Sequence, residues 1–271
     1  MEATNRIELF NGFYLTTSLG YAYRQSTADY DSKTFIGEII TDEDPLDFKD
    51  YGAFTSMIKF SYTPFQKYMS EPNRKVVLGS KFPTLSASHK KGWTGLFGSE
   101  IDFDYIEFMI RQKASIRSIG ISEYTLQTGQ FLNSTNLEFI DKKRFRQSDP
   151  YLYSNPMVSF QLLDTALSAT KPYAEVHYLH RFNGAITNNI PLLKKLRLST
   201  VAGAGFLWVE ESNFRHQEIF AGIEKIFKVG PRRRLKIGFL GVGAHSSGSS
   251  FKTDFKISID LIDTWKKDWS Y

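Results

Sequence analysis

Apolar and polar residues alternate with a period of two along most of this chain. The clearest example is the segment 252–261, where charged, Ser and Thr residues separate the apolar positions. Those apolar positions are Phe255, Ile257, Ile259 and Leu261. A period of two places alternate side chains on opposite faces of a strand, so the pattern predicts a strand with one apolar and one polar face.

The same period predicts about eleven strands and almost no helix. The segments are 11–24, 54–63, 101–105, 106–111, 124–126, 158–162, 176–178, 196–208, 219–223, 235–239 and 252–261. A change of phase between Tyr105 and Ile106 indicates a β-bulge. No Pro/Gly/Ser-rich linker divides the chain, so residues 1–271 are expected to form one all-β, antiparallel domain.

Two long polar stretches interrupt the strand pattern, at residues 25–51 and 131–155. The first contains the acidic run 41–45, and the second contains the basic run 142–146. Long loops of a transmembrane barrel face the cell exterior. Either stretch could also fold inward as a constriction, and the sequence leaves this open. In segment 196–208, Gly203 and Gly205 lie behind the apolar face and leave room in the lumen, or for something packed there.

The alternation favours a transmembrane barrel over a soluble sandwich. Lipid would cover the apolar faces, whereas a sandwich needs a second sheet to do so. No run approaches the roughly 20 apolar residues of a transmembrane helix. Aromatic residues make up 15% of the chain, and Trp265, Trp269 and Tyr271 at its end suit an interfacial girdle. We therefore predict an antiparallel β-barrel in the Gram-negative outer membrane.

The start of the chain has neither a basic nor an apolar stretch typical of an export signal. The chain is therefore expected to be the C-terminal portion of a larger barrel protein. The lack of cysteine fits passage through an oxidising periplasm. The net charge of +5 and the run 232–234 are interpreted as a charged turn or lipid-phosphate contact rather than a nucleic-acid site.

Charged residues on the polar faces are candidates for lining the lumen. They are Arg24, Lys59, Glu175, Arg197, Lys256 and Asp260. A short apolar segment, Ile190, Pro191, Leu192 and Leu193, is expected to cap one rim or to dock a periplasmic or membrane partner. The C-terminal closing strand is expected to comprise Phe255, Ile257, Ile259, Leu261 and Tyr271.

Catalytic chemistry is weakly supported. Glu175 and His177 share a strand face and could form an acid–His pair, but no Ser lies in a nucleophile-elbow pattern. Asp102 and Asp104 share a strand face and could bind Ca²⁺ weakly, but such a pair more often faces water. The sequence contains no Cys and no His-Glu-x-x-His motif. We expect no enzyme activity, no cofactor and no metal.

Several ordered blocks resemble a known family. They are 81–92, 95–99, 102–105, 180–184, 189–196 and 218–228. They resemble a large outer-membrane family of unknown function in the Bacteroidota, over roughly residues 54–271. The resemblance implies the barrel half of a longer protein whose N-terminal part is a carboxypeptidase-regulatory-like β-sandwich. The sandwich and first barrel strands are absent here, and the polar residues 215–217 depart from the family's pattern.

The expected role is an integral outer-membrane protein in envelope biogenesis, protein export or solute passage. Expected partners are outer-membrane lipid and lipopolysaccharide, the barrel-assembly machinery and a periplasmic or membrane protein, but not nucleic acid. One alternative is a soluble barrel whose apolar residues, among them Phe13, Leu15, Phe255 and Ile257, point inward around a small apolar ligand. A second alternative is an outer-membrane hydrolase that uses His177.

Overall fold

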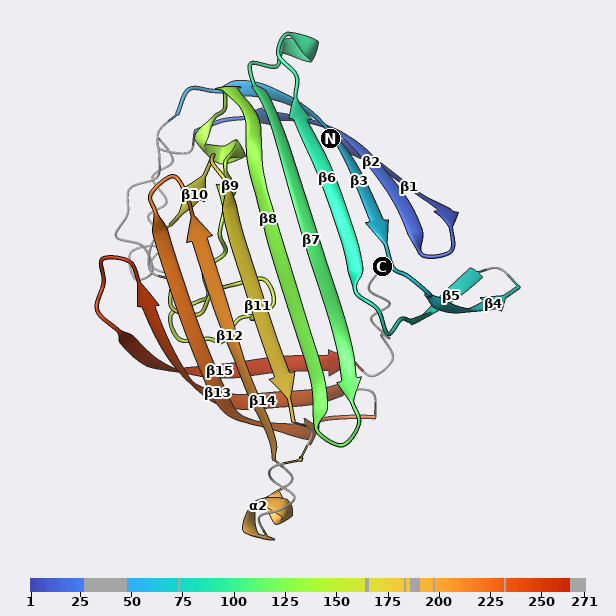
Figure 1. Ribbon diagram of the computed structural model, residues 1–271, viewed down its shortest axis with the longest axis vertical. Helices are drawn as coiled ribbons and strands as arrows, with labels where there is room; N and C mark the ends of the chain where they lie inside the picture. The colour runs from blue at the N-terminus through green and yellow to red at the C-terminus, as the bar shows by residue number, and fades with distance from the viewer. Residues whose placement is uncertain are drawn as a thin grey trace.

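Alternating residues form long strands in the computed structural model (Figure 1). The structure describes residues 1–26, 48–72, 74–163, 166–182, 184–185, 191–196, 198–231 and 233–263. Most of the acidic stretch 25–51 and the terminal aromatic residues, including Tyr271, lie outside these ranges. The expectations placed on them are therefore not addressed by the structure.

Eleven strands form one antiparallel sheet. They are β1 (Glu2–Phe10), β2 (Phe13–Arg24), β3 (Tyr51–Tyr62), β6 (Thr84–Gly92), β7 (Asp102–Ile116), β8 (Gly120–Asn136), β11 (Tyr173–Arg181), β12 (Ser199–Val209), β13 (Phe214–Lys228), β14 (Arg233–Ser246) and β15 (Lys252–Asp263). They are hydrogen-bonded in the order β1-β2-β3-β6-β7-β8-β11-β12-β13-β14-β15. The predicted all-β, antiparallel fold is confirmed.

Short elements lie outside this sheet. Strands β4 (Lys67–Glu71) and β5 (Arg74–Gly79) form a small hairpin, and β9 (Lys143–Arg144) pairs with β10 (Ser168–Ala169). The helical turns are η1 (Leu96–Gly98), η2 (Phe139–Asp141) and α2 (Pro191–Leu196). In the described ranges, no helix has the length and apolar character needed to cross a membrane.

The sheet curls but does not close. Strands β7 and β8 run down the middle of Figure 1, whereas β14 and β15 run across its lower part. Strands β1 and β15 stand at the two ends of the strand order, and they do not pair with each other in the described residues. The predicted barrel is therefore not closed within the described residues, where the edges of β1 and β15 stay unjoined.

The register joins apolar residues into a row on one face of the sheet, which we call the outer face. One residue from each of eight neighbouring strands lies directly opposite the next. The row is Phe10, Phe13, Tyr62, Leu85, Ile110, Leu126, Val176 and Phe206. A second row, Ile223, Phe239 and Ile257, continues on β13–β15 and is 44–51% exposed.

The opposite face, the inner face, carries polar and charged residues and, on β11–β14, buried apolar residues as well, and another part of the chain covers it there. The covering chain is residues 137–172, which connect β8 to β11 and which we call the inner segment. Its Phe145, Phe160 and Leu163 pack against Tyr173, Leu207 and Val209 of the sheet. Met157 packs farther along against Leu179, Val201, Phe220, Leu240 and Val242. Two buried apolar clusters therefore lie between the inner segment and β11–β14.

The long polar stretch 131–155 thus begins in β8 and then folds inward. Gly205 makes room for it, since a Cβ atom built there would lie 3.1 Å from Cδ1 of Phe160. The room that was predicted behind the apolar face of segment 196–208 is confirmed at this position.

Strand number and strand identity agree only in part with the sequence prediction. The bulge predicted near Tyr105 is confirmed by register shifts between Asp102 and Tyr105. The segments 101–105 and 106–111 form one strand, and 158–162 belongs to the inner segment. Strands β1 and β6 were not expected, because their polar residues interrupt the apolar alternation.

Candidate functional site

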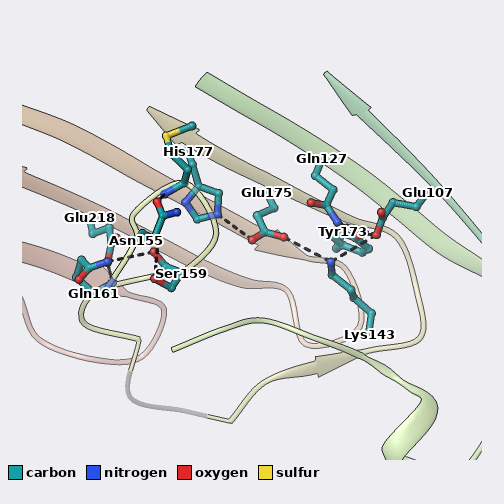
Figure 2. Close-up of polar contacts among 11 residues, drawn as sticks. Glu107, Gln127, Lys143, Asn155, Ser159, Gln161, Tyr173, Glu175, His177 and Glu218 are labelled. Carbon is teal, nitrogen blue, oxygen red and sulfur yellow. Dashed lines mark hydrogen bonds and ion pairs between the residues drawn. The ribbon is translucent and has the colours of Figure 1, made fainter. Parts of the chain in front are cut away.

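A polar network lies between the inner face of the sheet and the inner segment (Figure 2). Its first part joins β7, β8 and β11. The hydroxyls of Tyr105 and Tyr173 are 2.7 Å apart, and each donates to a carboxylate oxygen of Glu107, at 2.8 and 3.0 Å. The Gln127 amide donates to the same oxygen at 2.7 Å. Glu107 is therefore held by three donors from three strands.

Lys143 of the inner segment contacts this network. Its Nζ atom lies 3.5 Å from Glu107 and 3.7 Å from Glu175. Glu175 in turn lies 2.8 Å from Nε2 of His177. The acid–His pair expected from the i, i+2 spacing is therefore present, and an inner-segment cation connects it to Glu107.

A second acid–His pair lies on β13. His216 is 3.4 Å from Glu218 through Nε2 and 2.7 Å from the Ser246 hydroxyl through Nδ1. The Phe160 ring packs against both His177 and His216, with centroid distances of 4.6 and 5.4 Å. One aromatic side chain of the inner segment is thus seated between the two pairs.

Glu218 also binds the inner segment directly. One carboxylate oxygen accepts the backbone N–H groups of Gln161 and Leu162, at 2.7 and 3.2 Å. The side chain of Glu218 is 2% exposed. Leaving a buried donor unpaired costs about 1–3 kcal/mol, so this carboxylate contributes strongly to holding the segment.

Farther along the inner segment, Lys256 of β15 donates to the backbone carbonyl of Asp149 at 2.5 Å. The Asp149 carboxylate accepts the N–H groups of Leu152 and Tyr151, which hold its pKa below the ordinary value. The turn presents Tyr151 and Tyr153 to the edge of β15. There the Ile257 N–H donates to Tyr151 O at 3.1 Å, and Tyr153 N–H donates to Ile257 O at 2.8 Å.

The other end of the inner segment is tied to the β12–β13 turn. The Glu211 carboxylate accepts both the backbone N–H and the hydroxyl of Thr170, each at 2.9 Å. The backbone hydrogen bond is the main reason that the Glu211 pKa is lowered. The segment is therefore held at both ends as well as in its middle.

Five of the six predicted lining residues lie on the inner face. Arg24 pairs with Asp141 of the inner segment, and Asp260 pairs with Lys236 at 3.2 Å. Lys59 pairs in register with Ser88, and Ser88 pairs with Glu107, so Lys59 lies on the same face as Glu107. Glu175 and Lys256 are 6% and 1% exposed, so they contact the inner segment and do not face open water. The sixth residue, Arg197, lies outside the described residues.

The predicted rim segment is only partly described. Pro191, Leu192 and Leu193 begin helix α2, which lies beyond the ends of β11 and β12 (Figure 1). Ile190 lies outside the described residues, and the expected rim-capping or docking role of the segment stays a prediction. In the expected closing strand, Phe255, Ile257, Ile259 and Leu261 are 47–67% exposed on the outer face.

The arrangement offers little to a hydrolase mechanism. Ser246, His216 and Glu218 are linked in series, but His216 is 0% exposed. Ser122 and His180 are 2.7 Å apart beside a cavity on the outer face, yet no described carboxylate bonds to that histidine. Among the residues with described positions, no three acidic, His or Cys side chains gather as metal ligands would.

A cavity of about 270 Å³ opens between the inner segment and β7, β8 and β11. Four cations, Arg111, Lys143, Arg144 and Arg146, contribute to its lining. Its other lining residues include Thr125, Gln127 and Glu175. Three of the cations come from the basic run 142–146, which the sequence shows plainly. The sequence does not determine whether this run folds inward.

Comparison with known proteins identifies a family whose function is unknown. Residues 1–223 match the C-terminal domain of DUF5686, a family of unknown function. The match includes the first 53 residues, which the motif blocks had left out, and it stops within β13. No curated protein and no solved structure matches the chain. Because the matched region covers most of its length, the chain belongs to the DUF5686 family through its C-terminal domain.

Proposed function

We propose that this sheet forms the wall of a non-enzymatic outer-membrane β-barrel that acts in envelope biogenesis, protein export or solute passage. The observation that carries the proposal is the apolar outer row, which presents one side chain from each of eight adjacent strands. In this row, Phe10 is 57% exposed, Leu85 44% and Ile110 39%. Exposed apolar area of this extent marks an interaction surface, and lipid is the covering that suits an entire sheet face.

The inner face supports the same proposal. In transmembrane barrels, lipid-facing apolar residues alternate with polar residues that face the lumen. Here the polar side chains of Glu107, Glu175 and Glu218 lie on the inner face, opposite the apolar rows. Phe255 and Ile257 lie on the outer face, whereas an apolar-ligand barrel needs them inside. The inner segment then occupies the lumen, so the described conformation corresponds to a blocked passage.

Barrel closure is part of the proposal. A membrane does not tolerate unpaired strand edges, so β1 and β15 would each need a partner strand there. We place those partners in strands outside the described sheet. The carboxypeptidase-regulatory-like domain, the Bacteroidota source and the contacts with lipopolysaccharide and the assembly machinery belong to this proposal as well.

The test uses neighbouring residues that face opposite sides of β3. The chain has no cysteine, so Phe60→Cys and Lys59→Cys give single labelling sites. Each variant is spin-labelled and reconstituted into lipid vesicles, and its accessibility to oxygen and to a water-soluble nickel complex is measured. We expect a label at 60 to be reached mainly by oxygen, which concentrates in lipid. We expect a label at 59 to be shielded from lipid.

Nickel access at 60 as high as at 59 would contradict a lipid-covered outer face. A chain that stays monomeric in buffer without detergent would contradict it independently. Migration of unboiled and boiled samples on a gel addresses closure separately. A faster unboiled band means that the chain closes a barrel by itself, and a single band means that it needs further strands.

A further inference from the structure

The basic cavity has more positive charge than its own surroundings neutralise. Its lining contains four cations and one carboxylate, Glu175. Lys143 is balanced, because it lies within 4 Å of both Glu107 and Glu175. Among the described residues, no carboxylate pairs with Arg111, Arg144 or Arg146. Three exposed arginines therefore line this cavity without a carboxylate partner in the described part of the chain.

The cations are supplied by two walls of different origin. Arg111 lies on β7 and pairs in register with Thr125 of β8. Arg144 and Arg146 belong to the inner segment. The Arg144 guanidinium lies 4.5 Å from the Phe139 ring centroid and donates to Phe139 O at 3.3 Å. The cavity therefore exists only where the inner segment is seated on the sheet.

Neutral donors complete the lining. Thr125 is 6% exposed, and its hydroxyl has no hydrogen-bond partner. A buried hydroxyl without a partner is costly, and a ligand oxygen in this cavity would supply one. Gln127 lies on the same strand face and is held by Glu107. The site thus combines several guanidinium groups with a hydroxyl donor that is still available.

We propose that this cavity binds a phosphate group. Guanidinium groups match phosphate oxygens in pairs of parallel hydrogen bonds. A phosphate monoester carries close to two negative charges at neutral pH, which suits several unbalanced guanidinium groups better than a single carboxylate does. Sites for small molecules commonly measure roughly 300–1,000 Å³, so this cavity suits a compact ligand. The proposal does not depend on what covers the outer face.

The test is calorimetric titration of the full chain in detergent micelles. The probes are inorganic phosphate, glycerol 3-phosphate and a short-chain phosphatidic acid, with glycerol as the neutral control. We expect saturable binding of the phosphate probes and none of glycerol. Arg111→Met and Arg146→Met should each weaken binding about tenfold or more. Arg234→Met, which removes the same charge from β14, should leave it unchanged.

The relative affinities identify the source of the phosphate. Tighter binding of glycerol 3-phosphate supports a soluble ester, tighter binding of inorganic phosphate supports the free ion, and tighter binding of phosphatidic acid supports a lipid headgroup. The absence of saturable binding by all three probes would overturn the proposal. Equal weakening by Arg234→Met would also overturn it, because overall charge would then explain the effect.

Discussion

At the scale of single residues, the inner segment depends on a position that has no side chain. A Cβ atom at Gly205 would lie 2.9 Å from Cγ of Glu218 and 3.1 Å from Cδ1 of Phe160. Both neighbours are fixed, since Phe160 is 0% exposed and Glu218 accepts two backbone hydrogen bonds. Neither can move without loosening the segment.

Gly205→Val should therefore unseat the inner segment. Overpacking a filled site costs about 1–3 kcal/mol, and here the cost applies to the contact between segment and sheet. We expect limited proteolysis to cut within residues 145–163 much faster in the variant. Gly241→Val is the control, because its nearest neighbour is 3.6 Å away on the outer face. Equal cutting of the two variants would contradict this role of Gly205.

Parts of the site could be predicted at this scale and parts could not. The Glu175–His177 pair follows from an i, i+2 spacing on one strand, so the sequence shows it directly. The contacts of Lys143 with Glu107 and Glu175 span 36 and 32 residues of sequence. No local pattern encodes such contacts, because they depend on how the inner segment folds back.

At the scale of elements, the alternation of apolar and polar residues predicts the strands, but it does not predict the course of the connecting segments. Strands β2, β3, β12 and β15 are predicted well because one face of each is mainly apolar. The inner segment has no regular period, since its structure consists of short turns and two-residue strands. Its inward course is determined by pairs such as Glu218 with the Gln161 amide, which become visible only in three dimensions.

The Asp149 turn should make the contact with β15 dependent on pH. Its pKa is lowered in the folded chain, so the charged form stabilises the turn above about pH 4. That stabilisation is lost as the pH falls through the folded-state pKa. We expect the amides of Tyr153 and Ile257 to lose hydrogen-exchange protection on acidification, after correction for intrinsic rates.

Asp149→Asn provides the matched control, because it keeps a side-chain oxygen and removes the charge. In this variant, protection of the same two amides should no longer change between pH 5 and pH 3. The amide of Phe239, within the β13–β14–β15 ladder, should remain protected in both proteins. Loss of protection in the variant over the same pH range as in the parent would assign the effect to another group.

At the scale of the whole molecule, the two faces of the sheet should respond oppositely to added charge. Leu85 and Ser86 are neighbours on β6, with Leu85 in the outer apolar row and Ser86 on the inner face. An arginine on the lipid face of a barrel costs about 2–4 kcal/mol near the middle of the membrane. Leu85→Arg should therefore reduce insertion into lipid vesicles strongly, whereas Ser86→Arg should reduce it little.

Insertion is measured as the fraction of chain that floats with vesicles in a density gradient. Equal flotation of the two variants would show that the outer face is not in lipid. Higher yield of Leu85→Arg in detergent-free buffer would point instead to a water-exposed sheet. The two variants add the same charge at neighbouring positions, one on each face of β6.

At Ile257, binding of the inner segment and pairing with a further strand exclude each other. Its N–H and C=O groups bond to Tyr151 and Tyr153 at the open edge of the sheet. A strand that paired with β15 at this position would need the same two groups, so it would have to displace the tyrosines. Competition of this kind is reciprocal: whatever tightens the inner segment weakens strand addition by the same factor, and strand addition loosens the segment.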